Sequence, residues 1–362
     1  MIIFNNLRKT NNMKKYVLSI ICLIFVFQAF FVPKITTFAE NITNIYQIYD
    51  ENGEFLIDRD EVSVGDTFLT DDFVEWQIYL IVDDIAFARK KESIEKPLIN
   101  IKKSIVKPQS HKNICLYMTH NDESYKLTDG YDSTYGKGGI HDVAELLKKN
   151  LEEKNIYVEL DETLHIPHDS SAYSRSKVTA IKLQNNNNPE GLFDIHRDGA
   201  SRKLYLSQND KEPLSKVRIV VGKGNSNFEE NYAFAQEIFS IGQALYPWLF
   251  LDIYCGKGTY NQNIQSHALI FEMGSNEIEK EYVFNAVPYL ANVINAALYN
   301  SQSDENQITI DEDYVDTLEE EYNKNTNQNN AKNGILIFLI ISGVAVLAIF
   351  TIVLIKKYQK RE

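Results

Sequence analysis

Three residues that are able to bind a metal ion or move a proton stand at the ends of short apolar runs. They are His120, His196 and Glu272, and the runs that lead to them are 114–118, 192–195 and 268–271. Runs of this length are typical of buried strands. In a parallel sheet the carboxyl ends of the strands share one edge, where ligands bind. We therefore expect the three side chains to converge.

Glu123 stands three residues after His120, so both side chains are able to reach one metal ion. Two neutral imidazoles and one carboxylate, with water as the fourth ligand, form a common catalytic zinc set. Zinc polarises a carbonyl and lowers the pKa of water to about 7. A further carboxylate then transfers the proton, and Glu272 is the candidate. A single histidine is more often an ordinary polar residue at a strand end, but the set favours a metal.

Four further residues are candidates for contacts around this centre. His168 opens the segment 168–176, whose serines and aspartate are equally consistent with helix capping. Arg175 or Arg197 is able to hold a substrate carboxylate. Asp198 either orients a ligand histidine or pairs with Arg197. We expect His168 and Asp198 to support the metal ligands.

The segment 260–263 is rich in amides and follows two glycines. Asn261 and Gln262 are therefore candidates to hydrogen-bond a peptide or a sugar. A plain surface loop has the same composition, so the alternative stays open.

The composition excludes several classes of function. The net charge of −13, without basic clusters, argues against nucleic acid as a partner. Three cysteines without C-x-x-C spacing predict neither a disulfide framework nor a cysteine zinc site. The chain contains no G-x-S-x-G motif, and the glycines at 222–224 lack the spacing of a phosphate-binding loop.

The middle of the chain alternates predicted strands and helices. Residues 113–299 are therefore predicted to form an α/β catalytic domain with a mostly parallel sheet flanked by helices. Residues 41–95 show short strands separated by turns and predict a small β-rich domain. Residues 96–112 are basic, contain proline and are predicted to be a linker. Residues 300–333, acidic and rich in Asn and Gln, are predicted to be a solvated stalk.

Both ends of the chain carry apolar segments. Residues 1–39 have a basic start and a long apolar run, which fits a cleaved signal peptide or an uncleaved membrane anchor equally well. Residues 334–355 are predicted to be a transmembrane helix, and the tail 356–362 is basic. Positive residues stay in the cytoplasm, so we expect a protein of the cell membrane with an extracytoplasmic catalytic domain.

Several motifs resemble, in the same order, those of the stage II sporulation protein P family. They lie at 119–125, 168–176, 194–198, 229–231, 260–262 and 269–274. The resemblance covers about residues 113–299, and the β-rich region is similar to the amino-terminal region of clostridial members. It implies a zinc N-acetylmuramoyl-L-alanine amidase that acts on peptidoglycan during engulfment in sporulation. It also implies cleavage of peptide cross-links, a lytic transglycosylase partner and a membrane scaffold.

The resemblance also implies roles for individual residues. By position, His120 and His196 correspond to zinc ligands and Glu272 to the catalytic carboxylate. We expect Glu123 to be the third ligand. Glu145, on the following predicted helix, is the alternative, because related amidases take a glutamate from that helix.

The chain departs from the family pattern in three places. Met118 stands where members often have a second histidine, Gly199 replaces an alanine, and the carboxyl-terminal membrane segment is not typical. None of these changes removes an expected ligand. Two alternative functions remain: a zinc peptidase that acts only on stem peptides, and a non-catalytic scaffold that binds the wall.

Overall fold

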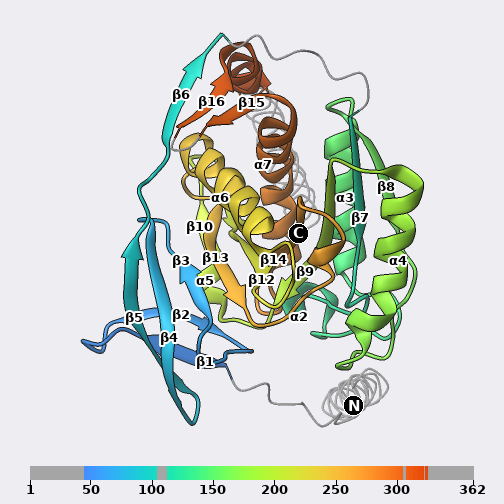
Figure 1. Ribbon diagram of the computed structural model, residues 1–362. Coiled ribbons are helices and arrows are strands. Elements are labelled where there is room, and N and C mark those ends of the chain that lie inside the picture. Colours follow the sequence, from blue (N-terminus) through green and yellow to red (C-terminus); the bar gives the residue numbers. More distant parts are fainter. Residues whose placement is uncertain (1–44, 104–111, 305–306, 322, 325–362) are drawn as a thin grey trace, which may run out of the picture. The chain divides into compact units, whose positions relative to one another are not determined.

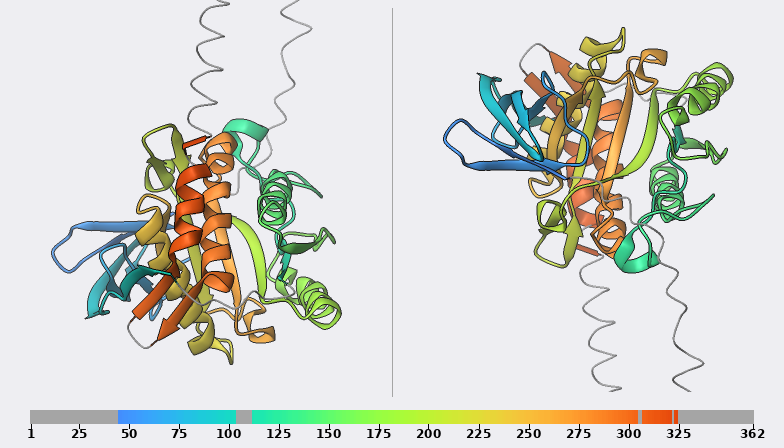
Figure 2. Two further views of the ribbon diagram at one scale, coloured as in Figure 1. Left: turned by 90° about the horizontal axis from the view of Figure 1, so that it is seen from above. Right: turned by 90° about the horizontal axis from the view of Figure 1, so that it is seen from below.

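The computed structural model describes residues 45–103, 112–304, 307–321 and 323–324 (Figures 1 and 2). These residues belong to one compact unit. The predicted signal peptide or anchor, the transmembrane segment 334–355 and the basic tail 356–362 lie outside the described residues. Within the described ranges, no helix combines the length and the apolar character needed to cross a bilayer.

A central sheet of eleven strands organises the described residues, in the order β2-β1-β5-β4-β3-β13-β12-β14-β9-β7-β8. The strands of its second half are β7 (Asn113–Tyr117), β8 (Tyr157–Asp161), β9 (Gly191–Asp198), β12 (Val217–Gly222), β13 (Phe250–Gly256) and β14 (Ala268–Ser275). Strands β8, β7, β9 and β14 are parallel to one another. Strand β12 is parallel to β13 but antiparallel to β14.

The sheet is therefore mixed, and the prediction of a mostly parallel sheet is wrong. One reason is the connection between β13 and β14, which contains only the short 3-10 helix η1 (Gln262–Ile264). A parallel return normally needs a crossover of a dozen or more residues, usually with an α-helix. Without one, the chain enters β14 in the opposite direction to β12 and β13.

The amino-terminal strands extend this same sheet. They are β1 (Tyr46–Tyr49), β2 (Phe55–Arg59), β3 (Thr67–Leu69), β4 (Val74–Val82) and β5 (Ile85–Ser93). The β-rich character of this region matches the sequence. The region does not form the separate small domain that the sequence predicts, because β3 pairs antiparallel with β13. Buried side chains of these strands, such as Ile57 and Phe68, also pack with Val220, Tyr254 and Ile270.

The predicted linker and stalk both contribute ordered strands. Strand β6 (Leu98–Lys102) pairs with β16 (Gln307–Asp311), which pairs with β15 (Ser301–Asp304), and residues 312–321 are helical. The structure thus corrects the stalk prediction at these residues. The physical reason is that Ile308, Ile310 and Leu318 are buried. A second small sheet joins β10 (Leu206–Gln208) to β11 (Pro213–Ser215).

Helices cover one face of the strands that carry the site, and a further helix covers the other face at β7 and β8 (Figure 1). The long ones are α3 (Ile140–Glu152), α4 (Ala172–Asn187), α6 (Phe228–Leu245) and α7 (Lys280–Tyr299), and the short ones are α2 (Lys126–Asp129) and α5 (Arg202–Tyr205). Side chains alternate between the faces of a strand. In β7, Ile114 and Leu116 pack in the core with α3, α6 and α7, whereas Cys115 and Tyr117 pack with α4.

Candidate metal centre

Three neighbouring parallel strands bring the chemically active residues to one edge of the sheet. Strand β9 lies between β7 and β14. His120 follows the end of β7, His196 lies in β9, and Glu272 lies in β14 as the register partner of His196. The expected convergence of these strand ends is therefore present in the fold.

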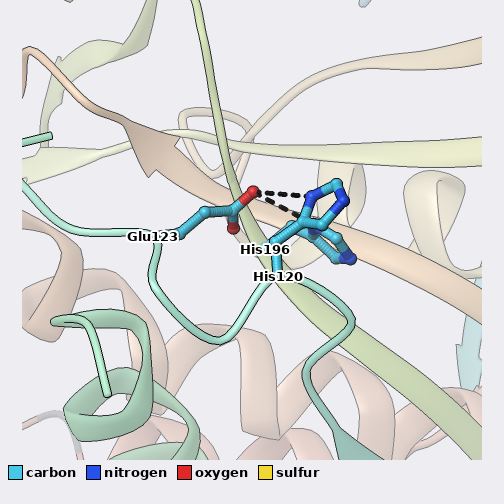
Figure 3. A group of neighbouring side chains, drawn as sticks. All are labelled: His120, Glu123 and His196. Atoms are coloured by element: carbon cyan, nitrogen blue, oxygen red, sulfur yellow. Dashed lines mark hydrogen bonds and ion pairs between the residues drawn. The ribbon is translucent and has the colours of Figure 1, made fainter. Parts of the chain in front are cut away.

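His120, Glu123 and His196 form a compact group of metal-binding atoms (Figure 3). One donor atom from each of the three lies within 4.8 Å of the others. Glu123 Oε1 lies 3.2 Å from His120 Nδ1 and 3.3 Å from His196 Nδ1. The other carboxylate oxygen accepts a hydrogen bond from the Arg197 backbone N–H at 2.9 Å. Glu145 is exposed on α3 and is not part of this group.

The second nitrogen of His196 lies at ion-pair distance from Asp194, without the geometry of a hydrogen bond. His196 Nε2 lies 3.1 Å from Asp194 Oδ1, and Asp194 also accepts hydrogen bonds from the Thr119 backbone N–H and hydroxyl at 2.8 and 2.6 Å. A carboxylate on one imidazole nitrogen fixes the tautomer and leaves the other nitrogen to bind a metal. Sequence reasoning missed Asp194. The available signal was its spacing of two residues from His196, which puts both on one face of β9.

The charges at this centre fit a cation. Burial opposes the imidazolium form of His196, but Asp194 and Glu123 raise the pKa of His196 well above its usual value. Burial also opposes the Glu123 carboxylate, yet the charge of His196 and the hydrogen bond from His120 hold the Glu123 pKa well below its usual value. Burial lowers the pKa of His120. The two carboxylates thus favour positive charge between the imidazoles, and a metal ion is one group that would supply it.

Two aromatic rings enclose the donor group. The His168 ring stacks on His120 with ring centres 3.9 Å apart, and His168 Nδ1 lies 2.9 Å from Asp122 Oδ1. The Tyr173 ring centre lies 5.5 Å from that of His120 and 6.2 Å from that of His196. The structure therefore places His168 next to an expected ligand, as predicted. Tyr173 was missed, because nothing in its sequence position distinguished it.

Asp198 does not contact a ligand histidine, and this prediction is wrong. Its carboxylate is paired with Arg218, lies 3.7 Å from Arg59 Nη1, and accepts a hydrogen bond from the Tyr205 hydroxyl at 2.7 Å. It does not pair with Arg197 either, because adjacent residues of a strand point to opposite faces. Arg218 from β12 and Arg59 from β2 instead neutralise the negative charge of Asp198.

The two arginines predicted to bind substrate hold loops of the protein. Arg175 Nε donates to the His165 carbonyl at 2.8 Å, and Arg175 Nη2 lies 2.7 Å from Asp169 Oδ1. Arg197 donates through Nε to the Ser124 carbonyl at 3.2 Å. Arg197 thereby fixes the loop that carries Glu123.

Asn261 and Gln262, the amides predicted to contact substrate, are buried and hydrogen-bond to the protein in this structure. Asn261 Nδ2 donates to the Ser176 hydroxyl at 3.0 Å. The Gln262 amide donates to the Val220 carbonyl at 2.8 Å and accepts from the Gly222 N–H at 2.7 Å. Asn261 thus ties the segment 260–262 to α4, and Gln262 ties it to β12.

Glu272 lies beside the donor group without belonging to it. It is 6% exposed, and its Oε2 has no hydrogen-bond partner among the described residues. Burial and the nearby Asp198 raise the pKa of Glu272 to about 8. A carboxylate whose pKa lies near neutrality is suited to accept and return a proton.

The model of the stage II sporulation protein P family matches residues 82–295. The chain belongs to this family. The match includes all three donor residues and Glu272. Stage II sporulation protein P of Bacillus subtilis (strain 168) is 27% identical over 209 residues, which cover 53% of this chain and 52% of that protein. The chain thus matches about half the length of this curated relative of the family.

Solved structures of amidases also resemble part of this family member. N-acetylmuramoyl-L-alanine amidase AmiC2 of Nostoc punctiforme has a TM-score of 0.32 and 11% identity, and covers 51% of this chain and 94% of its own. An N-acetylmuramoyl-L-alanine amidase from Clostridium difficile 630 has a TM-score of 0.31 and 12% identity, with 51% and 96% covered. The CwlD amidase from Clostridioides difficile, solved with the GerS lipoprotein, has a TM-score of 0.34 and 14% identity, with 52% and 95% covered.

Proposed function

We propose that this protein is a zinc-dependent peptidoglycan hydrolase that cleaves the N-acetylmuramoyl-L-alanine amide during engulfment in sporulation. The observation that carries the proposal is the group His120, Glu123 and His196 at one sheet edge, with Glu272 beside it. Membership of the family supports the link to sporulation. The donor set, two imidazoles and one carboxylate, is the kind that catalytic zinc uses.

The protein's own residues divide the work of amide hydrolysis. When bound, zinc supplies a Lewis acid that polarises the amide carbonyl and acidifies water. Glu123 and the two histidines would hold the ion, and Asp194 would keep His196 in the binding tautomer. Glu272 takes the proton from the attacking water and returns it to the leaving nitrogen. Tyr173 and His168 pack their rings against the two histidines and restrict the orientation of the imidazoles.

The setting of the reaction is part of the proposal. We propose that the protein is anchored at the cell membrane with its catalytic domain outside the cytoplasm. There it would act on peptidoglycan together with a lytic transglycosylase and a membrane scaffold. The net charge of −13 supports the absence of nucleic acid among its partners.

Product analysis tests this proposal directly. Purified peptidoglycan is digested with the protein, and the new amino groups are labelled and identified by mass spectrometry. We expect new amino-terminal L-alanine on the released stem peptides, and glycan strands whose lactyl groups carry free carboxylates. New amino termini from within the stem peptides alone would favour a zinc peptidase. Binding to peptidoglycan without any cleavage product would favour a wall-binding scaffold.

Removing the charge of Asp194 is expected to weaken zinc binding. The Asp194→Asn variant keeps the size of the side chain but loses the carboxylate that orients His196. Comparable contacts contribute about 10- to 100-fold in metal affinity. Competition with a zinc chelator measures the change, and Asp161→Asn, at a buried carboxylate that pairs with Lys182, serves as the control. Equal zinc affinity in wild type and Asp194→Asn would contradict this role.

A further inference from the structure

Arg59 reaches the catalytic edge from strand β2. It lies outside residues 82–295, where the family model matches. Its Nη2 is 3.7 Å from Glu272 Oε1, and its Nη1 is 3.7 Å from Asp198 Oδ2. The guanidinium lies over the Tyr254 ring, 4.5 Å from the ring centre, and the residue is only 8% exposed. The amino-terminal strands therefore place a buried positive charge beside the catalytic carboxylate.

The contact between Arg59 and Glu272 differs from a bidentate ion pair between an arginine and a carboxylate. Arg218 binds Asp252 with two hydrogen bonds, from Nε at 2.7 Å and from Nη2 at 2.9 Å. Arg59 stays too far from Glu272 for a hydrogen bond, and its Nε and Nη1 have no hydrogen-bond partner within the described ranges. It therefore attracts the Glu272 carboxylate through charge alone. The carboxylate keeps its capacity to accept a proton, which two strong hydrogen bonds would reduce.

Charge balance explains why this arginine is needed. Asp252 on β13, Glu272 on β14 and Asp198 on β9 are three buried carboxylates around Arg218 on β12, which is shared between Asp198 and Asp252. Without Arg59, the described contacts leave Glu272 with no arginine partner. His196 is then the remaining positive group near Glu272. Because a buried charge with less compensation is unfavourable, the Glu272 side chain would change its position or its charge.

Strand β2 is well placed to hold Arg59 rigidly. Ile57, two residues earlier, is buried in the core formed with Val220, Tyr254 and Ile270. Asp58 accepts a hydrogen bond from the Ser201 backbone N–H at 2.9 Å, just after the end of β9. The strand is thus tied to the segment that follows His196, and the arginine side chain has little freedom to move.

We infer that strand β2 completes the catalytic centre and that Arg59 is a positioning residue, which holds the Glu272 carboxylate beside the metal ligands. The inference rests on the proposed function, in which Glu272 moves the proton. It assigns a role in catalysis to the amino-terminal strands. It also explains why these strands continue the sheet of the catalytic residues through the pairing of β3 with β13.

The test compares four variants of the full chain: Arg59→Met, Arg59→Lys, Ile57→Val and Glu272→Gln. Ile57→Val is the matched control, because it disturbs the packing of the same strand without touching Glu272. The measurements are kcat and KM on soluble glycan strands with stem peptides, bound zinc and the thermal midpoint. A misplaced catalytic group typically costs on the order of 100-fold in rate. We expect a loss of about that size in kcat for Arg59→Met, with KM and bound zinc unchanged.

Arg59→Lys separates positioning by charge from simple packing. Because the contact is made through charge, Arg59→Lys is expected to have a kcat at least about tenfold higher than that of Arg59→Met. Ile57→Val is expected to lower the thermal midpoint but to keep the wild-type kcat. The inference would be overturned if the kcat of Arg59→Met equalled that of Ile57→Val. It would also be overturned if the kcat of Arg59→Lys were no higher than that of Arg59→Met. If Glu272→Gln retained full kcat, the proton-transfer role that the proposed function gives to Glu272 would fail, and the inference with it. If kcat fell in Glu272→Gln but not in Arg59→Met, only the inference about Arg59 would be rejected.

Discussion

Replacing Glu272 with glutamine is expected to lower kcat by about 10²- to 10⁴-fold, the usual contribution of a general acid–base group. Glutamine has nearly the same shape but cannot take up the proton. Bound zinc should stay at the wild-type level, because Glu272 lies outside the group formed by His120, Glu123 and His196. Steady-state hydrolysis of soluble glycan strands, together with metal analysis, measures both quantities.

Glu145→Gln is the matched control for this substitution. Glu145 is exposed on α3, so its replacement is expected to leave kcat within about twofold of wild type, as for most surface changes away from a site. If Glu272→Gln kept more than a tenth of the wild-type kcat, the proton transfer would have to be assigned to another residue. Loss of zinc in Glu272→Gln would instead place Glu272 among the ligands.

Replacing His196 with alanine is expected to abolish hydrolysis, with a loss of roughly a thousandfold or more, or about 4 kcal/mol of transition-state stabilisation. His196 is buried and provides one of the two imidazoles that face Glu123. Its loss also leaves Asp194 and Glu123 without the positive charge between them. The rate of wall digestion and the thermal midpoint measure the two consequences.

His141→Ala is the control for removing a buried histidine. His141 is buried on α3 and pairs with Glu162 at 3.1 Å, but it is not one of the donor residues. Its replacement is expected to reduce stability while leaving the rate per folded molecule unchanged. A rate in His196→Ala that matches that of His141→Ala would show that His196 contributes only to packing.

Much of the candidate site could be predicted because local patterns determine it. Short apolar runs predicted the strands, and polar residues at their ends predicted His120, His196 and Glu272 at one edge. The spacing of three residues between His120 and Glu123 brought the carboxylate to the same group. These inferences needed only that β7, β9 and β14 be parallel neighbours, which they are.

Strand direction could not be predicted from the same patterns. A buried strand has the same apolar sequence whether its neighbour is parallel or antiparallel, so the reversal of β14 against β12 left no signal. The order of the strands in the sheet could not be predicted either, because an apolar run does not indicate which strand lies next to it. Isolated apolar residues in a polar segment, such as Ile308 and Ile310, were also too few to predict β16 against the composition around them.

Side-chain partners that come from distant segments were the least predictable. Asp198 was expected to orient a ligand histidine, but Arg218 and Arg59 approach it from strands far apart in the sequence. The amides Asn261 and Gln262 were expected to face substrate, and composition alone gave no sign that they would be buried. Each of these outcomes depends on the tertiary packing of the sheet edge.

The metal content of the purified protein tests the central claim most directly. Wild type, His196→Ala and Glu145→Ala are prepared in parallel, and zinc is measured by mass spectrometry after removal of loosely bound metal. The structure predicts about one zinc ion per chain in wild type and in Glu145→Ala, and almost none in His196→Ala. Wild-type protein without zinc, or His196→Ala with as much zinc as wild type, would contradict the proposed metal centre.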